Sequence, residues 1–483
     1  MSVKNDVSQK QRALVLQGGG ALGAYEAGAL SILCEYLSRE DKKNKEKDGP
    51  LFDTIAGTSI GAMNAAVLVR NVVNRKISWK EAAEVLEHFW TDEAKEEEKE
   101  DDKKGGLSST PDFCKWLLDD EKKPKIFNGS PEAVRKYYSV KEYFFARAPN
   151  VFYPMSRVET DSRFQDNGVY GNQWQVYSSN PLEQTIKRYS KDESDEKKDD
   201  DDDDGLRIAT SWDQRQPRLL VISLDVAEGK TVAFDSYHRE AEDPGNPLYD
   251  ASDGITINHI MASGTLPELY KFRDIPKAGG RKFCDGGILS NTPFRELLQA
   301  HRDYWKKRVI TEDQDKIPDL DVYIVNVHPS KQHTAPPEDR DAVRDRINDI
   351  TYSDRNSHYD EMVADLATDY KDLLTDYTQL IDNLKELAKK HFKNKDQSET
   401  TTTFQDEFHN ILKDTEEKSR GGTIEDRKYK ELMKGRFKVT VTRIEPESYI
   451  DNIYGKGADF TSKTIKDLIA KGKQDARRVL EVQ

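Results

Sequence analysis

The hydrophobic positions of the first seventy residues form two repeats of a strand followed by a helix. An apolar run at residues 13–16 leads into three consecutive glycines, and a second predicted strand at residues 53–56, which ends in Ile55 and Ala56, leads into Gly57. After each turn, apolar residues recur at helical spacing. Short apolar runs bounded by glycine are typical of buried parallel strands, so this pattern predicts a β-α-β start to the fold.

The same alternation resumes later in the chain. We predict strands at residues 218–225, 231–234, 322–327 and 437–444, and helices at 77–90, 253–261 and 459–482. Strands that alternate with helices favour the α/β class with a mainly parallel central sheet. We expect a three-layer α/β/α arrangement.

Residues 335–435 differ from this pattern and are predicted to form a helical insertion. Apolar residues recur there at alternating spacings of three and four, which gives a heptad stripe. The stripe comprises Tyr359, Met362, Leu366, Tyr370, Leu373, Tyr377, Leu380, Leu384 and Leu387. A helical hairpin that packs on the main domain or on another subunit is the first interpretation, and a lid that touches lipid is the alternative.

Composition narrows the class of partner. The net charge of −14 over 483 residues comes mostly from two acidic runs, at 92–104 and 191–204, so nucleic acid is not an expected partner. We expect the charged segments 91–106 and 191–205 to be mobile loops. Residues 1–12 lack the apolar centre of a secretory signal. The longest apolar stretch is too short for a membrane span. These features favour a cytoplasmic protein, with peripheral contact to membranes left open.

The three cysteines, Cys34, Cys114 and Cys284, are scattered along the chain. Their spacing predicts neither a disulfide framework nor a metal site, and buried free thiols are the expected state.

The second glycine turn carries the clearest chemical signal. Gly57-Thr58-Ser59-Ile60-Gly61 has the spacing Gly-x-Ser-x-Gly and lies between a predicted strand and a predicted helix. This is the pattern of a nucleophile elbow, in which a cramped turn exposes the serine oxygen at a helix N-terminus. Ser59 is therefore the candidate nucleophile.

The first glycine turn has two interpretations. Gly18, Gly20 and Gly23 match the dinucleotide fingerprint Gly-x-Gly-x-x-Gly. That motif also needs an acid at the end of the second strand, where this chain has residues 56–59 without one. We therefore prefer an oxyanion hole, in which the exposed N–H groups of Gly18, Gly19 and Gly20 face the serine.

Together with two later blocks, these turns resemble the patatin-like phospholipase family. The later blocks are the 262–267 stretch, with Ser263 and Pro267, and Asp285-Gly286-Gly287. By itself, an Asp before two glycines is a common turn. The resemblance implies a catalytic dyad in which Ser59 attacks an ester carbonyl and Asp285 accepts its proton, with no metal and no cofactor. Leu22 stands where the family often has a basic residue.

A rival reading of the residues is an α/β-hydrolase triad in the order Ser-Asp-His. Asp225 follows one predicted strand and His328 follows another, so Ser59, Asp225 and His328 fit that order. This triad leaves the Asp285 motif without a role, and we therefore favour the dyad.

The resemblance also fixes the expected domains and activity. We expect a hydrolase domain at 13–334, the helical insertion at 335–435, and a C-terminal strand and helix at 436–483 that complete the sheet. The expected activity is that of a phospholipase A or lipid acyl hydrolase, whose substrate is a lipid ester. Transient contact with a membrane surface and oligomerisation through the insertion are the partner interactions left open. A catalytically silent relative that binds lipid or a protein is the alternative from another class.

Overall fold

The structure of the protein is a computed structural model. It describes residues 10–44, 49–103, 153–154, 177–178, 180–190, 206–237, 254–267, 270–275, 280–311, 317–330, 336, 340–354, 357–392, 437–447 and 456–482. The predicted mobile segment 191–205 and Cys114 lie outside the described residues.

The chain divides into two compact units, which we describe separately. One unit comprises Arg12–Leu297, Tyr323–Ser357 and Thr442–Gln483, and we call it the main unit; it holds every candidate site residue. The other comprises Met1–Gln11, Leu298–Val322 and His358–Val441, and we call it the helical unit. The domain limits expected from the sequence stay a prediction.

Strands of a single mixed sheet form the centre of the fold, with the order β12-β11-β1-β2-β6-β10-β9 and with β7 also paired to β6. The strands of this sheet are β1 (Lys10–Leu16), β2 (Thr54–Thr58), β6 (Arg218–Asp225), β7 (Lys230–Asp235), β9 (Arg273–Asp274), β10 (Lys282–Asp285), β11 (Asp319–Val325) and β12 (Val439–Ile444). The short pairs are β3 (Tyr153–Pro154) with β4 (Tyr177–Ser178), and β5 (Arg207–Ile208) with β8 (Ile255–Thr256). The predicted α/β class with a mainly parallel sheet is confirmed.

The pairing register brings the ends of two strands together on either side of β6. β2 runs parallel to β6, with Thr58 opposite Ile222. β10 runs antiparallel to β6 on its other side, with Asp285 opposite Ser223. Neighbouring strands lie about 4.8 Å apart, so the residue after Thr58 and Asp285 are held at the same height, about two strand spacings apart.

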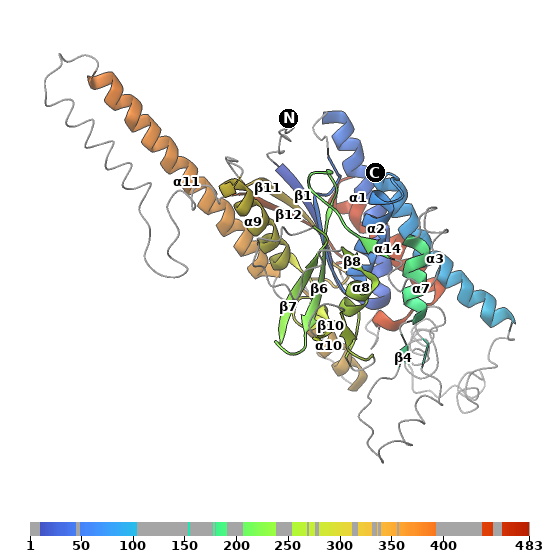
Figure 1. The fold of residues 1–483 in the computed structure, drawn as a ribbon. Helices are drawn as coiled ribbons and strands as arrows, with labels where there is room; N and C mark the ends of the chain where they lie inside the picture. Colours follow the sequence, from blue (N-terminus) through green and yellow to red (C-terminus); the bar gives the residue numbers. More distant parts are fainter. Residues whose placement is uncertain are drawn as a thin grey trace. The chain divides into compact units, whose positions relative to one another are not determined.

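Helices of the main unit pack together on one side of β1, β2 and β6 (Figure 1). These helices are α1 (Gly23–Asn44), α2 (Ile60–Val73), α3 (Trp79–Lys103), α7 (Asn180–Ser190), α8 (Ile257–Ser263) and α14 (Ser462–Val479). α14 lies along α1, where a Cβ on Gly28 would stand 2.1 Å from the carbonyl oxygen of Ile469. The two helices therefore meet backbone to backbone, and α14 is part of the core.

Helix α3 is longer than the sequence pattern predicted. The helix was expected at 77–90, with a charged loop after it, but α3 continues to Lys103. The added residues are mostly Glu and Lys, which are good helix formers, so the charged run extends the helix.

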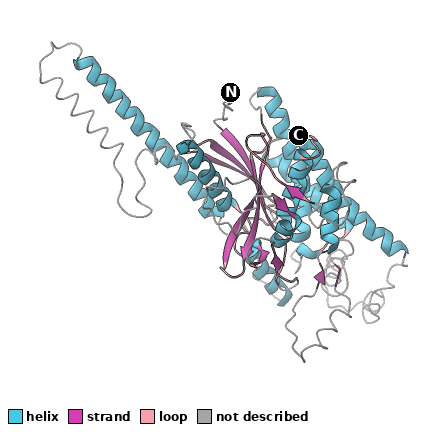
Figure 2. Ribbon diagram, viewed as in Figure 1, coloured by secondary structure: helices cyan, strands magenta, loops and turns pink. Residues whose placement is uncertain are grey.

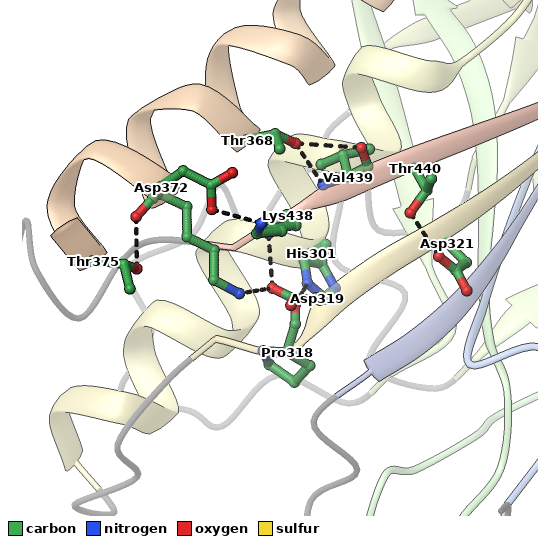
Figure 3. A network of polar contacts seen from close by, with 11 residues as sticks. His301, Pro318, Asp319, Asp321, Thr368, Asp372, Thr375, Lys438, Val439 and Thr440 are labelled. Carbon is green, nitrogen blue, oxygen red and sulfur yellow. Dashed lines mark hydrogen bonds and ion pairs between the residues drawn. The ribbon is translucent and has the colours of Figure 1, made fainter.

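The helical unit holds α9 (Phe294–Thr311) from Leu298 onward, and nearly all of α11 (Ser357–Phe392). α11 is a single long helix, drawn among the cyan helices of Figure 2. The hydroxyl of Thr368 accepts the N–H of Val439 at 3.2 Å, and Asp319 accepts the N–H of Lys438 at 2.7 Å (Figure 3). Lys371 also bonds to Asp319. These contacts fix one side of α11 against β12, and they leave much of the predicted heptad stripe exposed.

Three short 3-10 turns and helix α10 complete the described elements. The turns are η1 (Gly20–Leu22), η4 (Gly286–Ile288) and η5 (Lys456–Ala458), and α10 spans Arg340–Tyr352. Across the described residues, every helix is too short or too polar to cross a membrane.

Candidate active site

Ser59 lies in a strained turn between β2 and α2. Its backbone has φ 54° and ψ −125°, a conformation that residues with a side chain rarely adopt. The turn is tight enough to exclude side chains beside it: a Cβ on Gly57 would stand 2.5 Å from the carbonyl carbon of Gly61. Strain of this kind is maintained only where surrounding structure enforces it, and it commonly marks a functional residue.

Asp285 meets Ser59 at this turn. The aspartate ends β10, is 3% exposed, and its carboxylate is hydrogen-bonded to the side chain of Ser59. Oδ1 of Asp285 also accepts the N–H of Gly287 at 2.7 Å, while its own N–H donates to the carbonyl of Thr265 at 2.8 Å. The two residues that the sequence analysis paired are therefore in direct contact, although 226 positions separate their numbers.

The environment of Asp285 adjusts its basicity. Burial raises the pKa of its carboxyl from 3.8 to about 6, and the hydrogen bonds from Ser59 and Gly287 lower that pKa in part. A carboxylate with a pKa near 6 is still mostly ionised at pH 7. It is also a stronger base than an exposed aspartate, so it is better suited to accept a hydroxyl proton.

The glycine turn after β1 borders the serine. A Cβ on Gly18 would lie 3.1 Å from the Cβ of Ser59, so only glycine allows this approach. The N–H of Gly18, however, donates to the carbonyl of Asn291 at 3.1 Å. Within the described residues, the N–H groups of Gly19 and Gly20 have no such acceptor. The predicted row of three donors is thus reduced to two candidates.

The other motif glycines provide close approaches of the backbone. A Cβ on Gly61 would lie 2.5 Å from the carbonyl oxygen of Leu16, and one on Gly286 would lie 2.7 Å from that of Ile222. A Cβ on Gly23 would lie 2.6 Å from the side chain of Ile60. These glycines let the two turns and the Asp285 loop pack directly on the sheet.

Ser263, at the end of α8, fixes the backbone of the elbow. Its hydroxyl accepts the N–H of Ser59 at 2.8 Å and donates to the carbonyl of Ile222 in β6. The side chain is completely buried. The sequence motif that contains Ser263 does not predict this role, because nothing local in the sequence indicates which backbone group the side chain contacts.

Gln17 joins the glycine turn to two other segments. Its Nε2 donates to the hydroxyl of Thr292 at 2.8 Å, and its Oε1 accepts the N–H groups of Val327 and His328 at 2.8 and 2.9 Å. From the other side, η5 covers the turn, since a Cβ on Gly20 would lie 2.3 Å from the carbonyl oxygen of Gly457. Contacts over such sequence distances have no local signature.

The residues of the rival triad have other surroundings. The carboxylate of Asp225 accepts the N–H groups of Ala227 and Glu228 and bonds to Arg281 at 2.7 Å. His328 is buried, and burial together with the charge of Lys456 lowers its pKa to about 3. A histidine that acts as a triad base is stabilised as a cation by its acid, which has the opposite effect on its pKa.

Metal-binding side chains and the neighbouring Cys284 are the other groups to consider. Within the part of the chain that the structure describes, no cluster of three or more His, Cys, Asp or Glu side chains could hold a metal ion. Cys284 is buried beside Asp285, and burial raises the pKa of its thiol to about 12, which keeps it protonated.

A strained serine after a parallel strand, bonded to a buried aspartate beside a glycine turn, matches the geometry of the nucleophile-elbow pattern in an α/β fold. The model of the patatin-like phospholipase family matches residues 14–298 of this chain. That match covers more than half of the 483 residues, and the chain therefore belongs to the patatin-like phospholipase family.

Solved structures and curated proteins provide two further comparisons. The crystal structure of VipD from Legionella pneumophila is similar at a TM-score of 0.31 and 14% sequence identity, over 98% of this chain and 67% of that chain. At this TM-score the likeness adds no support to the family assignment. Among curated proteins, none matches the sequence.

Proposed function

We propose that this protein is a serine hydrolase that cleaves acyl esters of lipids through a dyad of Ser59 and Asp285. The observation that carries the proposal is the hydrogen bond between the Ser59 side chain and a buried carboxylate whose pKa is about 6. A hydroxyl bonded to a base is the basic requirement for nucleophilic catalysis. Membership of a family of lipid acyl hydrolases supports a lipid ester as the substrate.

The first half of the reaction forms an acyl-enzyme. The Ser59 oxygen attacks the ester carbonyl carbon while Asp285 accepts the hydroxyl proton. The resulting oxyanion receives hydrogen bonds from the N–H groups of Gly19 and Gly20, each of which is worth roughly a factor of 10² to 10³ in kcat. Collapse of this tetrahedral intermediate breaks the bond to the alcohol, which leaves with the proton held by Asp285.

The second half releases the acid. Water attacks the acyl carbonyl, Asp285 accepts a proton from that water, and the same two amides stabilise the second oxyanion. Collapse breaks the bond to Ser59, whose oxygen recovers its proton from Asp285. The cycle uses only groups of this chain and one water molecule.

Labelling by a fluorophosphonate tests the proposal, because these reagents modify an activated serine. We expect the reagent to label Ser59 and to label nothing in Ser59→Ala. We expect Asp285→Asn to lower kcat/KM on a p-nitrophenyl ester by about three orders of magnitude or more, as loss of the acid–base partner does in other serine hydrolases. His328→Ala should stay within a few-fold of the parent protein.

The alternatives give different results. An α/β-hydrolase triad predicts that His328→Ala and Asp225→Asn abolish activity while Asp285→Asn keeps it. A silent, lipid-binding relative predicts a folded protein whose Ser59 is not labelled and which hydrolyses no ester. Either outcome would overturn the proposed dyad.

A further inference from the structure

Helix α10 of the main unit buries a charged residue on one face and exposes apolar residues on the other. On its inner face, Asp349 is 3% exposed and is paired with Lys456 of η5 at 2.6 Å. On its outer face, Val343, Ile347 and Ile350 are 40, 59 and 44% exposed. These three residues are spaced by four and three positions, so they form one stripe along the helix.

This arrangement is the reverse of what a surface helix normally shows. A helix on a soluble domain buries its apolar stripe and presents charges to water. Here a buried ion pair replaces apolar packing on the inside, and three β-branched aliphatic side chains face outward. Contiguous exposed apolar surface of this kind usually marks an interaction site.

The stripe on α10 is attached to the loop that carries Asp285. α10 contacts η4, the turn that directly follows Asp285, and both belong to the main unit. The side-chain amide of Asn291 in that loop donates to the carbonyl of Tyr352, the last residue of α10, at 2.6 Å. Leu289, between η4 and Asn291, is 52% exposed. Figure 1 shows α10 beside the end of β10.

We propose that Leu289, Val343, Ile347 and Ile350 form a docking patch that inserts into the surface of a phospholipid membrane. The proposal rests on the function proposed above, since it brings the candidate nucleophile to the level of a lipid ester. The patch would enter the boundary between headgroups and acyl chains, which amphipathic surfaces penetrate by about 5–10 Å.

The composition of the patch favours lipid over a protein partner. All four side chains are aliphatic, whereas the centres of protein interfaces are enriched in aromatic residues and arginine. Arg344, which is exposed next to Val343, can reach the phosphate of a headgroup. Among the nearby acids whose side chains the structure describes, Asp349 is paired with Lys456 and Asp354 with Arg443.

Vesicle flotation tests the patch independently of catalysis. The full-length Ser59→Ala protein is mixed with phosphatidylcholine vesicles, so that binding is measured without hydrolysis. We expect this protein to float with the vesicles. Adding Ile347→Gln and Ile350→Gln should weaken the partitioning at least tenfold, since each substitution removes a buried aliphatic side chain from the lipid-bound state.

A matched control is Leu373→Gln in α11, which removes a side chain of comparable size that is 66% exposed outside the patch. We expect this variant to float like its parent. Equal flotation of the parent and the doubly substituted protein would overturn the proposal, as would equal losses in the control and the patch variant. Failure of the parent to float would also overturn it, and would point to a protein as the partner of this surface.

An activity ratio separates failure of the patch from failure of the dyad. With Ser59 intact, the rate on phosphatidylcholine vesicles is divided by the rate on a soluble p-nitrophenyl ester. We expect Ile347→Gln with Ile350→Gln to lower this ratio at least tenfold. An unchanged ratio would reject the docking patch and keep the esterase, whereas no hydrolysis of either substrate by the parent protein would reject the proposed function.

Discussion

Gly18 and Asn291 are joined by two hydrogen bonds that run in opposite directions. The N–H of Gly18 donates to the main-chain carbonyl of Asn291 at 3.1 Å, and the side-chain amide of Asn291 donates to the carbonyl of Gly18 at 3.0 Å. The same amide also bonds to the carbonyl of Tyr352. The loop that carries the proposed base thus also holds the turn that carries the proposed oxyanion donors.

Asn291→Ala should therefore lower catalysis more than it lowers substrate affinity. The substitution leaves two main-chain carbonyls without their donor and frees the glycine turn to shift. A loss of one oxyanion donor costs roughly a factor of 10² in kcat, so we expect a decrease of about 10- to 100-fold in kcat with little change in KM. Steady-state kinetics on a soluble ester measure both constants.

Asn71→Ala is the matched control for that substitution. The side chain of Asn71 is also buried and donates to two main-chain carbonyls, those of Val67 and Tyr189. It lies in α2, away from the glycine turn. Both variants should lose stability, but only Asn291→Ala should lose kcat; equal losses of kcat would reduce the role of Asn291 to general stability.

Ser263→Ala should impair the elbow specifically. Removal of the hydroxyl leaves the N–H of Ser59 and the carbonyl of Ile222 without a partner in a buried site, which costs about 1–3 kcal/mol of unfolding free energy. The strained turn then loses one of its restraints, and we expect a decrease in the rate of fluorophosphonate labelling on the order of tenfold.

Ser236→Ala provides the comparison. The hydroxyl of Ser236 is buried and accepts the N–H of Leu219 at 2.8 Å, at the opposite end of β6 from the elbow. Urea denaturation should show a similar loss of stability in both serine variants, while labelling should slow only in Ser263→Ala. Unchanged labelling in Ser263→Ala would show that the elbow keeps its shape without this bond.

Gly20→Ala should disrupt the glycine turn. Gly20 has φ +59°, and an added Cβ would lie 2.3 Å from the carbonyl oxygen of Gly457, which is backbone and cannot move aside cheaply. We expect a decrease of at least 10²-fold in kcat/KM, because the oxyanion donors move with the turn. Gly229→Ala is the control that separates backbone strain from steric contact. Gly229 has φ +63°, and no heavy atom lies within 4 Å of the added Cβ. That variant should cost only about 1–2 kcal/mol in stability and should keep its activity.

The pKa of Asp285 predicts opposite effects of pH on activity and stability. Activity needs the ionised carboxylate, so kcat/KM should rise with pH and level off above about pH 6. Stability changes the other way. The folded-state pKa is higher than the unfolded value, so the native protein binds this proton more tightly, and the resulting stabilisation is lost as pH rises from about 4 to 6.

Asp285→Asn should consequently stabilise the protein at pH 8, where the parent must keep a buried charge. The expected gain is about 1.4 kcal/mol for each pH unit by which burial raises the pKa, and it should disappear near pH 4. Urea denaturation at both pH values measures it. A variant that is less stable than the parent at pH 8 would contradict a raised pKa.

Local sequence patterns were enough to predict most of the fold and the pairing of Ser59 with Asp285. Ser59 was predictable because a nucleophile elbow needs small residues at fixed spacing, and Asp285 because its two glycines completed an ordered set of motifs. The α/β class was predicted because apolar runs typical of strands alternate with segments whose apolar residues have helical spacing. Each of these signals is contained in a short segment of the sequence.

Other parts of the site depend on contacts that no local pattern encodes. The bond that occupies the N–H of Gly18 comes from Asn291, 273 positions later in the chain, so the loss of one expected donor could not be foreseen. The raised pKa of Asp285 depends on burial by several segments. The extension of α3 was missed because a charged run was interpreted as a loop, although Glu and Lys favour helix.

The covering of Gly20 by Gly457, together with the packing of α14 along α1, has a consequence for biosynthesis. The family match ends at residue 298, yet the turn beside Ser59 gains one of its walls only from residues more than 150 positions further on. A ribosome must therefore translate more than 150 residues beyond the end of that match before the candidate site can assemble. A nascent or prematurely terminated product would carry Ser59 without this wall, so the proposed activity should be absent from incomplete copies.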